Sequence, residues 1–392
     1  MNHIEKLIEE LCPNGVEFKK LGEFATLDRG NGMPKTMLVD SGVGAIHYGQ
    51  IYTHYGVSAD KTLSFVTNDD ASRLTKVHPG DVIITNTSEN LEDVATTVVW
   101  LGDDDIVIGG HSSVIRHDQD ARFIAYWFRS AAFEKQKYRL ATGAKVIDIS
   151  AKKLESVVVP VPPLEVQREI VKVLDLFTDL EAELEAELVA RRKQYEHYRD
   201  QLLTFPEDGE TPWVNMGDLV EIGTGSMNTN DSVDGGPYPF FVRSQLPRRS
   251  DCWQFDETAI ITAGDGVGVG KVFHFVEGKY ALHQRAYRIC VKDKRLNAKF
   301  LFHFIRSRFS DYLAKASVHA SVTSLRMRMF QRFLVPLPPL SEQKRIAEIL
   351  DTFDALVNDL ESGLPAEIEA RRKQYEYYRD KLLTFKQLEP AA

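Results

Sequence analysis

The side chains best suited to a binding chemistry gather in the second half of the chain. Arginine, glutamine, serine and histidine are concentrated in three short segments, Arg243–Arg249 (RSQLPRR), Gln284–Arg285 and His319–Arg328 (HASVTSLRMR). Arginine, glutamine, asparagine and serine read base edges in the major groove of DNA, and lysine and arginine hold phosphates. We therefore predict a DNA-binding surface here. For any one of these residues, an ordinary solvated surface position is the alternative.

The individual DNA-binding candidates fall into a stronger and a weaker set. The stronger set comes from these segments and two nearby positions: Arg243, Ser244, Gln245, Arg248, Arg249, Lys271, His283, Gln284, Arg285, His319, Ser321, Thr323, Arg326 and Arg328. The weaker set lies in the first half of the chain: Tyr48, Gln50, Asn86, Thr87, His111, Ser112 and Lys145.

His111 and His283 occupy matching points if Gly110-His-Ser is aligned with Leu282-His-Gln. We expect each histidine to be structural or DNA-facing rather than a catalytic base. The acidic run Asp103–Asp105 would repel phosphates, so we expect it in a turn that faces away from DNA.

The charge distribution favours the same region. The net charge of the chain is -9, yet residues 212–339 hold 17 Lys and Arg against 11 Asp and Glu, which is +6. Residues 1–163 hold 17 against 22, which is -5. The second half is therefore the better electrostatic match for DNA, since the local charge pattern says more about partners than the total does.

No catalytic or metal-binding pattern is recognisable. The run Gly264–Lys271 lacks the Ser or Thr after its lysine that a phosphate-binding loop needs, because Val272 stands there. Its Asp-Gly pair favours a hairpin turn, and a flexible DNA-contacting loop with Lys271 is the alternative. Nucleophile-elbow, HExxH and S-adenosylmethionine-loop patterns are missing. Cys12, Cys252 and Cys290 have no CxxC spacing, so we expect neither a disulfide nor a metal site.

The elements that must position these residues come from a duplication. Ala190–Phe205 (ARRKQYEHYRDQLLTF) returns as Ala370–Phe385 (ARRKQYEYYRDKLLTF) with two substitutions. Upstream, Val159–Leu164 (VPVPPL) returns as Val335–Leu340 (VPLPPL). The offset between the copies is 176 residues at the proline run and 180 at the arginines, so the second copy has four extra residues in between.

Each proline run leads into a long helix with heptad spacing. After Leu164 the apolar positions are Ile170, Val173, Phe177, Leu180, Leu184, Leu188, Tyr195, Tyr198, Leu202 and Phe205, whose spacings of three and four predict a coiled coil with one stutter. In the second copy, Gly363 suits the end of one helix and Pro365 the first turn of the next. We therefore predict a break in the second rod.

Residues 1–160 and 206–336 read as two copies of one mixed domain of short strands and a few helices. Strands are predicted at Asp81–Thr85, Ala95–Trp100, Ser113–Ile115 and Ala259–Thr262, and an amphipathic helix at Phe123–Phe128. Tyr126–Ser130 matches His303–Ser307. The predicted helical spacers are residues 161–205 and 337–385, followed by a tail, 386–392.

A polar cluster is repeated unchanged on both rods, namely Arg191, Arg192, Lys193 and Gln194, and Arg371, Arg372, Lys373 and Gln374. Core packing does not demand the identity of charged residues. We expect an external partner to bind this face, and a plain solvated face is the alternative.

The arrangement resembles the specificity subunit of type I restriction-modification enzymes over essentially the whole chain. The resemblance rests on VPVPPLEVQREIVKVLD, VPLPPLSEQKRIAEILD and the two copies of RRKQYxxYRDxLL. It implies an α+β fold with two mixed α/β target-recognition domains separated by two long antiparallel coiled-coil helices. An internal pseudo-twofold repeat would relate the two halves.

The resemblance also implies a function. Each domain would read one half of an asymmetric, split site in double-stranded DNA, and the helices would act as spacers and dock modification subunits, of which we expect two. Restriction (motor-nuclease) subunits would complete the enzyme, and catalysis, S-adenosylmethionine, ATP and magnesium would belong to the partner subunits. The alternatives from other classes are a structural coiled-coil adaptor and a stand-alone DNA-modifying enzyme. No apolar run approaches 18 residues, so we expect a cytoplasmic protein without membrane contact.

Overall fold

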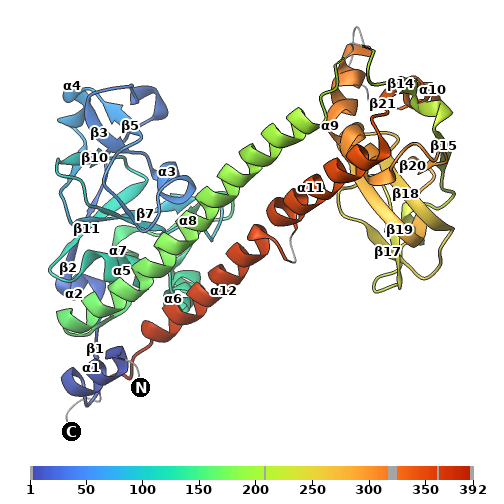
Figure 1. Ribbon diagram of the computed structural model, residues 1–392. Helices are drawn as coiled ribbons and strands as arrows, with labels where there is room; N and C mark the ends of the chain where they lie inside the picture. The colour runs from blue at the N-terminus through green and yellow to red at the C-terminus, as the bar shows by residue number, and fades with distance from the viewer. Residues whose placement is uncertain (1–2, 207–208, 317–324, 360–361, 389–392) are drawn as a thin grey trace. The chain divides into compact units, whose positions relative to one another are not determined.

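A computed structural model describes residues 3–206, 209–316, 325–359 and 362–388 (Figure 1). The chain divides into two compact units, Met1–Glu183 with Ile368–Ala392, and Leu184–Glu367. Each unit joins one mixed domain to helical segments from both copies of the repeat. The duplication in the sequence is therefore also the organising feature of the structure.

The first unit is built on two main sheets. A five-stranded sheet has the order β2-β11-β7-β9-β4 and a four-stranded sheet has the order β5-β3-β10-β6. The strands are β1 (Glu17–Lys20), β2 (Ala25–Arg29), β3 (Val43–Ile46), β4 (Ser58–Ala59), β5 (Ser64–Val66), β6 (Thr75–Val77), β7 (Val82–Thr85), β8 (Thr87–Ser88), β9 (Thr97–Trp100), β10 (Ile106–Ile108), β11 (Ser112–His117), β12 (Ile147–Asp148) and β13 (Val158–Val161). Its helices are α1 (His3–Leu11), α2 (Leu21–Phe24), α3 (Tyr48–Thr53), α4 (Asn68–Ala71), α5 (Ala121–Trp127), α6 (Ala131–Leu140) and α7 (Ala151–Glu155), with a short 3-10 turn η1 (Lys35–Met37).

The second unit has one six-stranded sheet of order β15-β20-β18-β19-β16-β17. The strands are β14 (Trp213–Asn215), β15 (Val220–Thr224), β16 (Tyr238–Phe241), β17 (Arg248–Ser250), β18 (Phe255–Ala263), β19 (Phe273–Leu282), β20 (Ala286–Val291) and β21 (Leu334–Pro336). Its helices are α9 (Ala298–Ala316), α10 (Met327–Gln331) and α11 (Leu340–Asn358), with 3-10 turns η2 (Met216–Asp218) and η3 (Thr229–Asp231). Helices α8 (Leu164–Leu202) and α12 (Leu364–Leu382) contribute to both units.

The two domains share a strand plan but differ in one hairpin. In the second domain β18 and β19 pair continuously from Phe255↔Tyr280 to Thr262↔Phe273. In the first domain the same ladder is split into β6 with β10 and β7 with β9. Between β9 and β10 the ladder is interrupted by an exposed bend that contains Asp103–Asp105. This bend agrees with the turn predicted for these residues.

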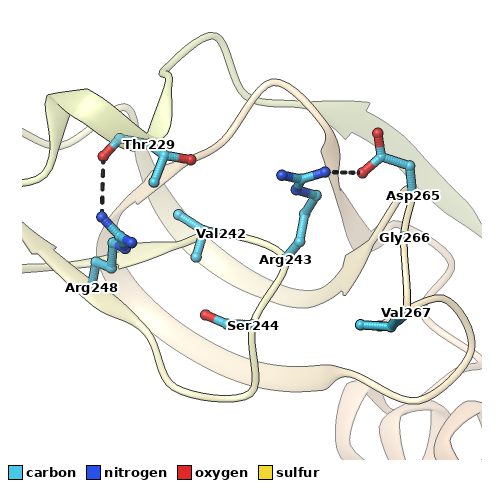
Figure 2. A pocket seen from close by; sticks show the side chains of 9 residues that line it. Thr229, Val242, Arg243, Ser244, Arg248, Asp265, Gly266 and Val267 are labelled. Atoms are coloured by element: carbon cyan, nitrogen blue, oxygen red, sulfur yellow. Dashed lines mark hydrogen bonds and ion pairs between the residues drawn. The ribbon is translucent and has the colours of Figure 1, made fainter.

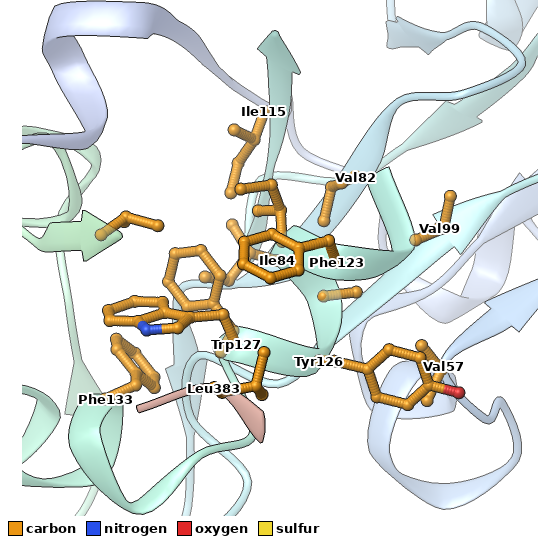
Figure 3. Close-up of a cluster of buried hydrophobic side chains, with 14 of the residues drawn as sticks. Val57, Val82, Ile84, Val99, Ile115, Phe123, Tyr126, Trp127, Phe133 and Leu383 are labelled. Atoms are coloured by element: carbon orange, nitrogen blue, oxygen red, sulfur yellow. The ribbon is translucent and has the colours of Figure 1, made fainter. Parts of the chain in front are cut away.

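The main core of the first unit joins aromatic side chains of residues 123–133 to aliphatic side chains of β7, β9 and β11 (Figure 3). The Trp127 ring packs against Phe128 and Phe133 at centroid distances of 5.5 and 5.6 Å. Every residue from Phe123 to Phe128 is at most 2% exposed. The predicted helix is confirmed as α5, but its amphipathic pattern is wrong over these six residues, because strands, α8 and Leu383 pack with them in one core.

The glutamine that follows each proline run locks the start of the next helix onto its domain. Gln167 accepts a hydrogen bond from the Asp120 backbone N–H at 3.0 Å and donates to the Pro162 carbonyl at 2.7 Å. Gln343 accepts from the Asn297 N–H and donates to the Pro338 carbonyl, both at 2.8 Å. Both glutamines are fully buried. The repeated PxPPLxxQ motif is thus a structural clamp, because a buried amide must have all its polar atoms paired.

The helices of the two repeats pack antiparallel within each unit. In the first unit Phe177 of α8 lies 5.5 Å from the Tyr378 ring of α12, and Arg372 pairs with Glu181 one turn further along. In the second unit Phe353 of α11 lies 5.8 Å from the Tyr198 ring of α8. Phe353 is the repeat equivalent of Phe177 at the offset of 176 residues, and Tyr378 is that of Tyr198 at the offset of 180. The two units therefore contain the same contact with the repeats exchanged.

The long helix and the break were both predicted correctly. Helix α8 runs without interruption for 39 residues. Helix α11 ends at Asn358 and α12 begins at Leu364. A Cβ on Gly363 would lie 2.5 Å from the Ala355 carbonyl oxygen, so only glycine fits against the end of α11. Among the helices of the described residues, none is long and apolar enough to cross a membrane.

Candidate nucleic-acid interface

Three loop segments of the second domain meet around one carboxylate. Arg243 follows β16, Asp265 follows β18, and Arg285 immediately precedes β20. Arg243 Nη1 lies 2.7 Å from Asp265 Oδ1, and Arg285 Nη1 lies 3.1 Å from Asp265 Oδ2. The side chains of both arginines remain accessible, at 42% and 61% exposure. The carboxylate therefore orients two cationic groups that still face solvent.

The glycines of the run Gly264–Lys271 bring this carboxylate into place. The Gly264 N–H donates to the Arg285 carbonyl at 2.8 Å, and a Cβ on Gly264 would lie 2.6 Å from that oxygen. A Cβ on Gly268 would lie 2.7 Å from the Arg243 carbonyl oxygen. The run connects β18 to β19 as a long hairpin loop, so the predicted hairpin is confirmed. Close backbone contacts require glycine at positions 264 and 268, and a positive φ favours glycine at positions 266 and 270.

Two hollows open beside this group. One of about 380 Å³ is lined by Thr229, Val242, Arg243, Ser244, Arg248, Asp265, Gly266, Val267 and Gly268, and Figure 2 shows the Arg243–Asp265 pair at its edge. The other, of about 510 Å³, is lined by Asn228, Thr229, Asn230, Asp231, Arg243, His283, Gln284 and Arg285. Thr229 and Arg243 line both hollows, and Arg243 is the charged residue that the two hollows share.

His283 shapes the turn that carries Gln284 and Arg285. It is 5% exposed, and its Nδ1 accepts a hydrogen bond from the Arg285 backbone N–H at 3.0 Å. Burial lowers the pKa of His283, and the positive charges of Arg243 and Arg285 lower it further. The ring is therefore held neutral and acts on the loop, while the neighbouring Gln284 is exposed and bonded to Asn228.

Two of the other DNA-binding candidates of the second domain, both arginines, have hydrogen-bond partners within the domain. Arg249 donates to the carbonyls of Gly236 and Pro237 at 2.8 and 2.9 Å, and Arg248 donates to Ser232 Oγ at 3.2 Å. The remaining candidates with described positions are exposed: Ser244, Gln245, Lys271, Arg326 and Arg328. His319, Ser321 and Thr323 lie outside the described residues.

The first domain has an aromatic group at the corresponding place. The Tyr48 ring lies 4.7 Å from the His111 ring and 4.6 Å from the His47 ring. Thr87 Oγ1 lies 2.7 Å from His111 Nδ1. Burial is the largest of the effects that lower the pKa of His47. At this position the first domain therefore has aromatic rings and a hydroxyl group, whereas the second domain has charged side chains.

Three candidates of the first domain have structural partners. Asn86 is fully buried and donates to the Ile149 carbonyl at 2.9 Å, and Ser112 is fully buried with its hydroxyl on the Gly109 carbonyl at 3.0 Å. The prediction that these two side chains contact DNA is therefore wrong, because both are buried and paired inside the domain. Gln50 donates to Ser64 Oγ at 2.7 Å and caps α3. Lys145 is exposed.

The alignment of His111 with His283 is wrong by two residues. The Asn86 N–H donates to the His111 carbonyl at 2.8 Å in the same way that the Gly264 N–H donates to the Arg285 carbonyl. In the adjacent ladders Ser112 pairs with Thr85, and Ala286 pairs with Ala263. His111 therefore occupies the position of Arg285, because strand pairing rather than a shared histidine sets the register.

Sequence reasoning missed Asp265 and His47. The Asp265-Gly266 pair predicts only a turn, although its place directly after a strand and between two segments that contain arginine was the available signal. His47 carried no signal in the sequence, since its contact with Tyr48 depends on the bend at the start of α3.

The repeated polar clusters lie on exposed stretches of α8 and α12. Arg191 Nη1 donates to Gln194 Oε1 at 3.0 Å, and Arg371 Nη1 donates to Gln374 Oε1 at 3.1 Å. Lys193 and Lys373 are exposed. The Arg–Gln contact is thus the same in each unit, and Arg372 is in addition ion-paired with Glu181.

Comparisons with known proteins agree with this architecture. The family model described as Type I restriction modification DNA specificity domain matches residues 13–190 and again 209–370. The specificity subunit of the type I restriction enzyme EcoR124I/EcoR124II from Escherichia coli is 30% identical over 419 residues, covering 98% of this chain and 97% of that protein. The specificity subunit of the type I restriction enzyme MpnII from Mycoplasma pneumoniae is 32% identical over 211 residues, covering 50% of this chain and 62% of that protein.

A solved structure has the same fold over almost the full length. The type I restriction-modification S subunit from M. genitalium superimposes with a TM-score of 0.63 at 13% identity, covering 94% of this chain and 96% of that one. A chain from a structure that describes complex assembly and conformational transition of the type I R-M system gives a TM-score of 0.62 at 18% identity, covering 95% of this chain and 98% of that one. With both halves matched by the family model and a relative aligned from end to end, the chain belongs to the family of type I restriction-modification DNA specificity subunits.

Proposed function

We propose that this chain is the DNA sequence-specificity subunit of a type I restriction-modification complex. The observation that carries the proposal is the pairing of one duplicated scaffold with two different polar surfaces. The strand plan, the buried glutamine and the helix contacts recur in both units, whereas Arg243 and Arg285 stand in one domain and Tyr48 and His111 in the other. Two copies of one DNA-binding domain with different contact residues are suited to bind two half-sites of different sequence.

Each domain reads one half of an asymmetric split site in double-stranded DNA. The second domain has the positive charge that phosphate contact needs, and its arginines are exposed next to open hollows. The first domain, at -5 over residues 1–163, relies on aromatic and neutral polar groups. The long helices set the spacing between the half-sites.

The chain contributes recognition rather than catalysis. S-adenosylmethionine, ATP and magnesium belong to the modification and restriction subunits in this proposal, and two modification subunits dock on the helices. The two exposed copies of the Arg-Arg-Lys-Gln cluster support two equivalent docking faces, one per unit. The proteins that the chain resembles are named as specificity subunits, which supports the same division of labour.

Single-molecule methylation mapping tests the proposal. DNA from cells that express this chain with its modification subunit should carry methylation at two short, different half-sites around a fixed gap. The modification subunit expressed without the chain is the control and should leave that motif unmethylated. Formation of a normal complex without any sequence-specific methylation or DNA binding would contradict the proposal and favour an adaptor. Methylation by the purified chain without partners would favour a stand-alone enzyme.

A further inference from the structure

The two domains place different side chains at three equivalent positions. The first position lies two residues after the end of a strand that pairs in parallel with its neighbour. In the first domain it is Tyr48, which follows the pair Ile46↔Ile108. In the second domain it is Arg243, which follows the pair Phe241↔Leu282. The other positions flank the pairs Thr85↔Ser112 and Ala263↔Ala286. They are Thr87 and His111 in the first domain, and Asp265 and Arg285 in the second.

The side chains at these positions contact each other in both domains. In the second domain both arginines bind the Asp265 carboxylate. In the first domain the His111 ring contacts both the Tyr48 ring and the Thr87 hydroxyl. The scaffold therefore brings the same three positions together whatever residues occupy them, and the residues are charged in one domain and uncharged or aromatic in the other.

The charged group of the second domain is arranged to donate hydrogen bonds outward. Each arginine meets Asp265 through Nη1 alone, and among the described residues neither guanidinium has a second side-chain partner. The edge formed by Nε and Nη2 therefore keeps its donors. A guanidinium edge matches the O6 and N7 acceptors of guanine in the major groove, the commonest specific contact between proteins and DNA.

We propose that these three equivalent positions select bases in each domain, and that Arg243 and Arg285, oriented by Asp265, bind guanines in the second half-site. This inference rests on the proposed function and deepens it by naming residues and a base. Arg243 and Arg285 make the base contacts, and Asp265 is a positioning residue. Tyr48 and His111 make the corresponding contacts in the first domain without a guanidinium, and the buried Thr87, like Asp265, is a positioning residue.

The Asp265 carboxylate has a role at a DNA-binding surface because it holds Arg243 and Arg285 in place. Without Asp265, two guanidinium groups held close together by the loops would repel each other and would sample many orientations. With it, the group has a net charge of +1 and a defined geometry. The ion pairs lower the pKa of Asp265 against the raising effect of its partial burial, so the carboxylate stays ionised at neutral pH.

Methylation mapping of point variants tests this inference in the assembled complex. Arg285→Ala and Arg243→Ala should each lower discrimination for guanine at one position of the second half-site by roughly 5- to 150-fold, the range expected for loss of one bidentate contact. The first half-site and the gap should be unchanged. Arg295→Ala is the matched control, because Arg295 is also an exposed arginine paired with an aspartate, Asp293 at 2.7 Å. It should leave the motif unaltered.

Conservative variants separate base reading from a loss of folding. Arg285→Lys and Arg243→Lys keep the charge but lose the guanidinium edge, so DNA affinity should be retained while guanine discrimination falls. Asp265→Asn should have opposite effects on two quantities. Discrimination should fall, while non-specific affinity and its salt dependence should rise, because the group gains one net positive charge. A purely structural role for Asp265 would not raise non-specific affinity.

The outcomes distinguish this inference from the proposed function. A split motif for the wild type with guanine in the second half-site, relaxed at single positions in the arginine variants, supports the inference. A split motif whose second half-site lacks guanine on both strands, or one that the alanine variants read unchanged, overturns it and leaves the proposed function standing. The absence of any split motif for the wild type overturns the proposed function itself.

Discussion

Replacing Gln343 with methionine should destabilise the second unit by about 2–4 kcal/mol. Methionine has nearly the volume of glutamine, so the change removes hydrogen bonds without opening a cavity. The Asn297 N–H loses its acceptor, and the carbonyls of Arg295 and Pro338 each lose a donor, all at 2.8 Å in the wild type. Each lost bond contributes about 0.5–1.5 kcal/mol net, and these partners lie where water enters only partly.

Hydrogen exchange with urea titration is the appropriate assay, since a chain of two compact units need not unfold in one step. Protection should fall in β21, α9 and the start of α11. Gln167→Met is the matched change in the first unit and should weaken α5 and the start of α8 instead. Gln374→Ala, on an exposed helix face, should change the free energy of unfolding by less than about 0.5 kcal/mol.

A glutamate at the same position gives a further check. Gln343→Glu keeps the acceptor for the Asn297 N–H but places a buried carboxylate against two carbonyl oxygens, which raises its pKa. The variant should therefore be less destabilised at pH 5 than at pH 8. The reasoning fails if Gln343→Met leaves exchange in the second unit unchanged, or if the loss of protection appears in the first unit.

Three other predictions follow from the structure. Burial lowers the pKa of four histidines in the folded state, namely His47, His117, His274 and His283. The unfolded state therefore binds more protons, and the free energy of unfolding should fall as the pH drops below about 6.5. Urea titration at several pH values measures this change. Phe177→Ala and Phe353→Ala remove the same aromatic contact in different units, and each should reduce helix protection in its own unit by a similar amount, whereas an effect confined to one variant would contradict the repeat. Inserting four helical residues between Leu180 and Leu188 lengthens α8 by about 6 Å and should change the gap in the methylated motif, and an altered half-site sequence would refute the spacer role.

The duplication was fully visible in the sequence because it is a linear property. Near-identical segments at constant offsets require no knowledge of contacts, and Pro, Gly and heptad spacing act locally. The 39-residue helix and the break before Leu364 were predicted for that reason. The buried Gln167 and Gln343 were recognisable as repeated residues, but their role as clamps needed the structure, since their partners outside the proline runs lie 46 to 48 residues away.

Side-chain exposure was less predictable, because it depends on what the rest of the fold places nearby. Phe123–Phe128 has a helical pattern, yet all six residues are buried in one core with strands and α8. Asn86 and Ser112 have base-reading chemistry but are committed to backbone partners inside the domain. In the heptad series Tyr198 remains 41% exposed although Tyr195 is buried.

The sequence by itself determined that this protein is a duplicated pair of mixed domains on long helices, because residue identity, local turn chemistry and helical periodicity act along the chain. Only the tertiary structure decided which loop residues meet. Arg243, Asp265 and Arg285 come from three separate connections, and their equivalence to Tyr48, Thr87 and His111 follows from strand register. Register is set by pairing between distant strands, and two domains whose loops have diverged share that pairing without sharing the residues that it brings together.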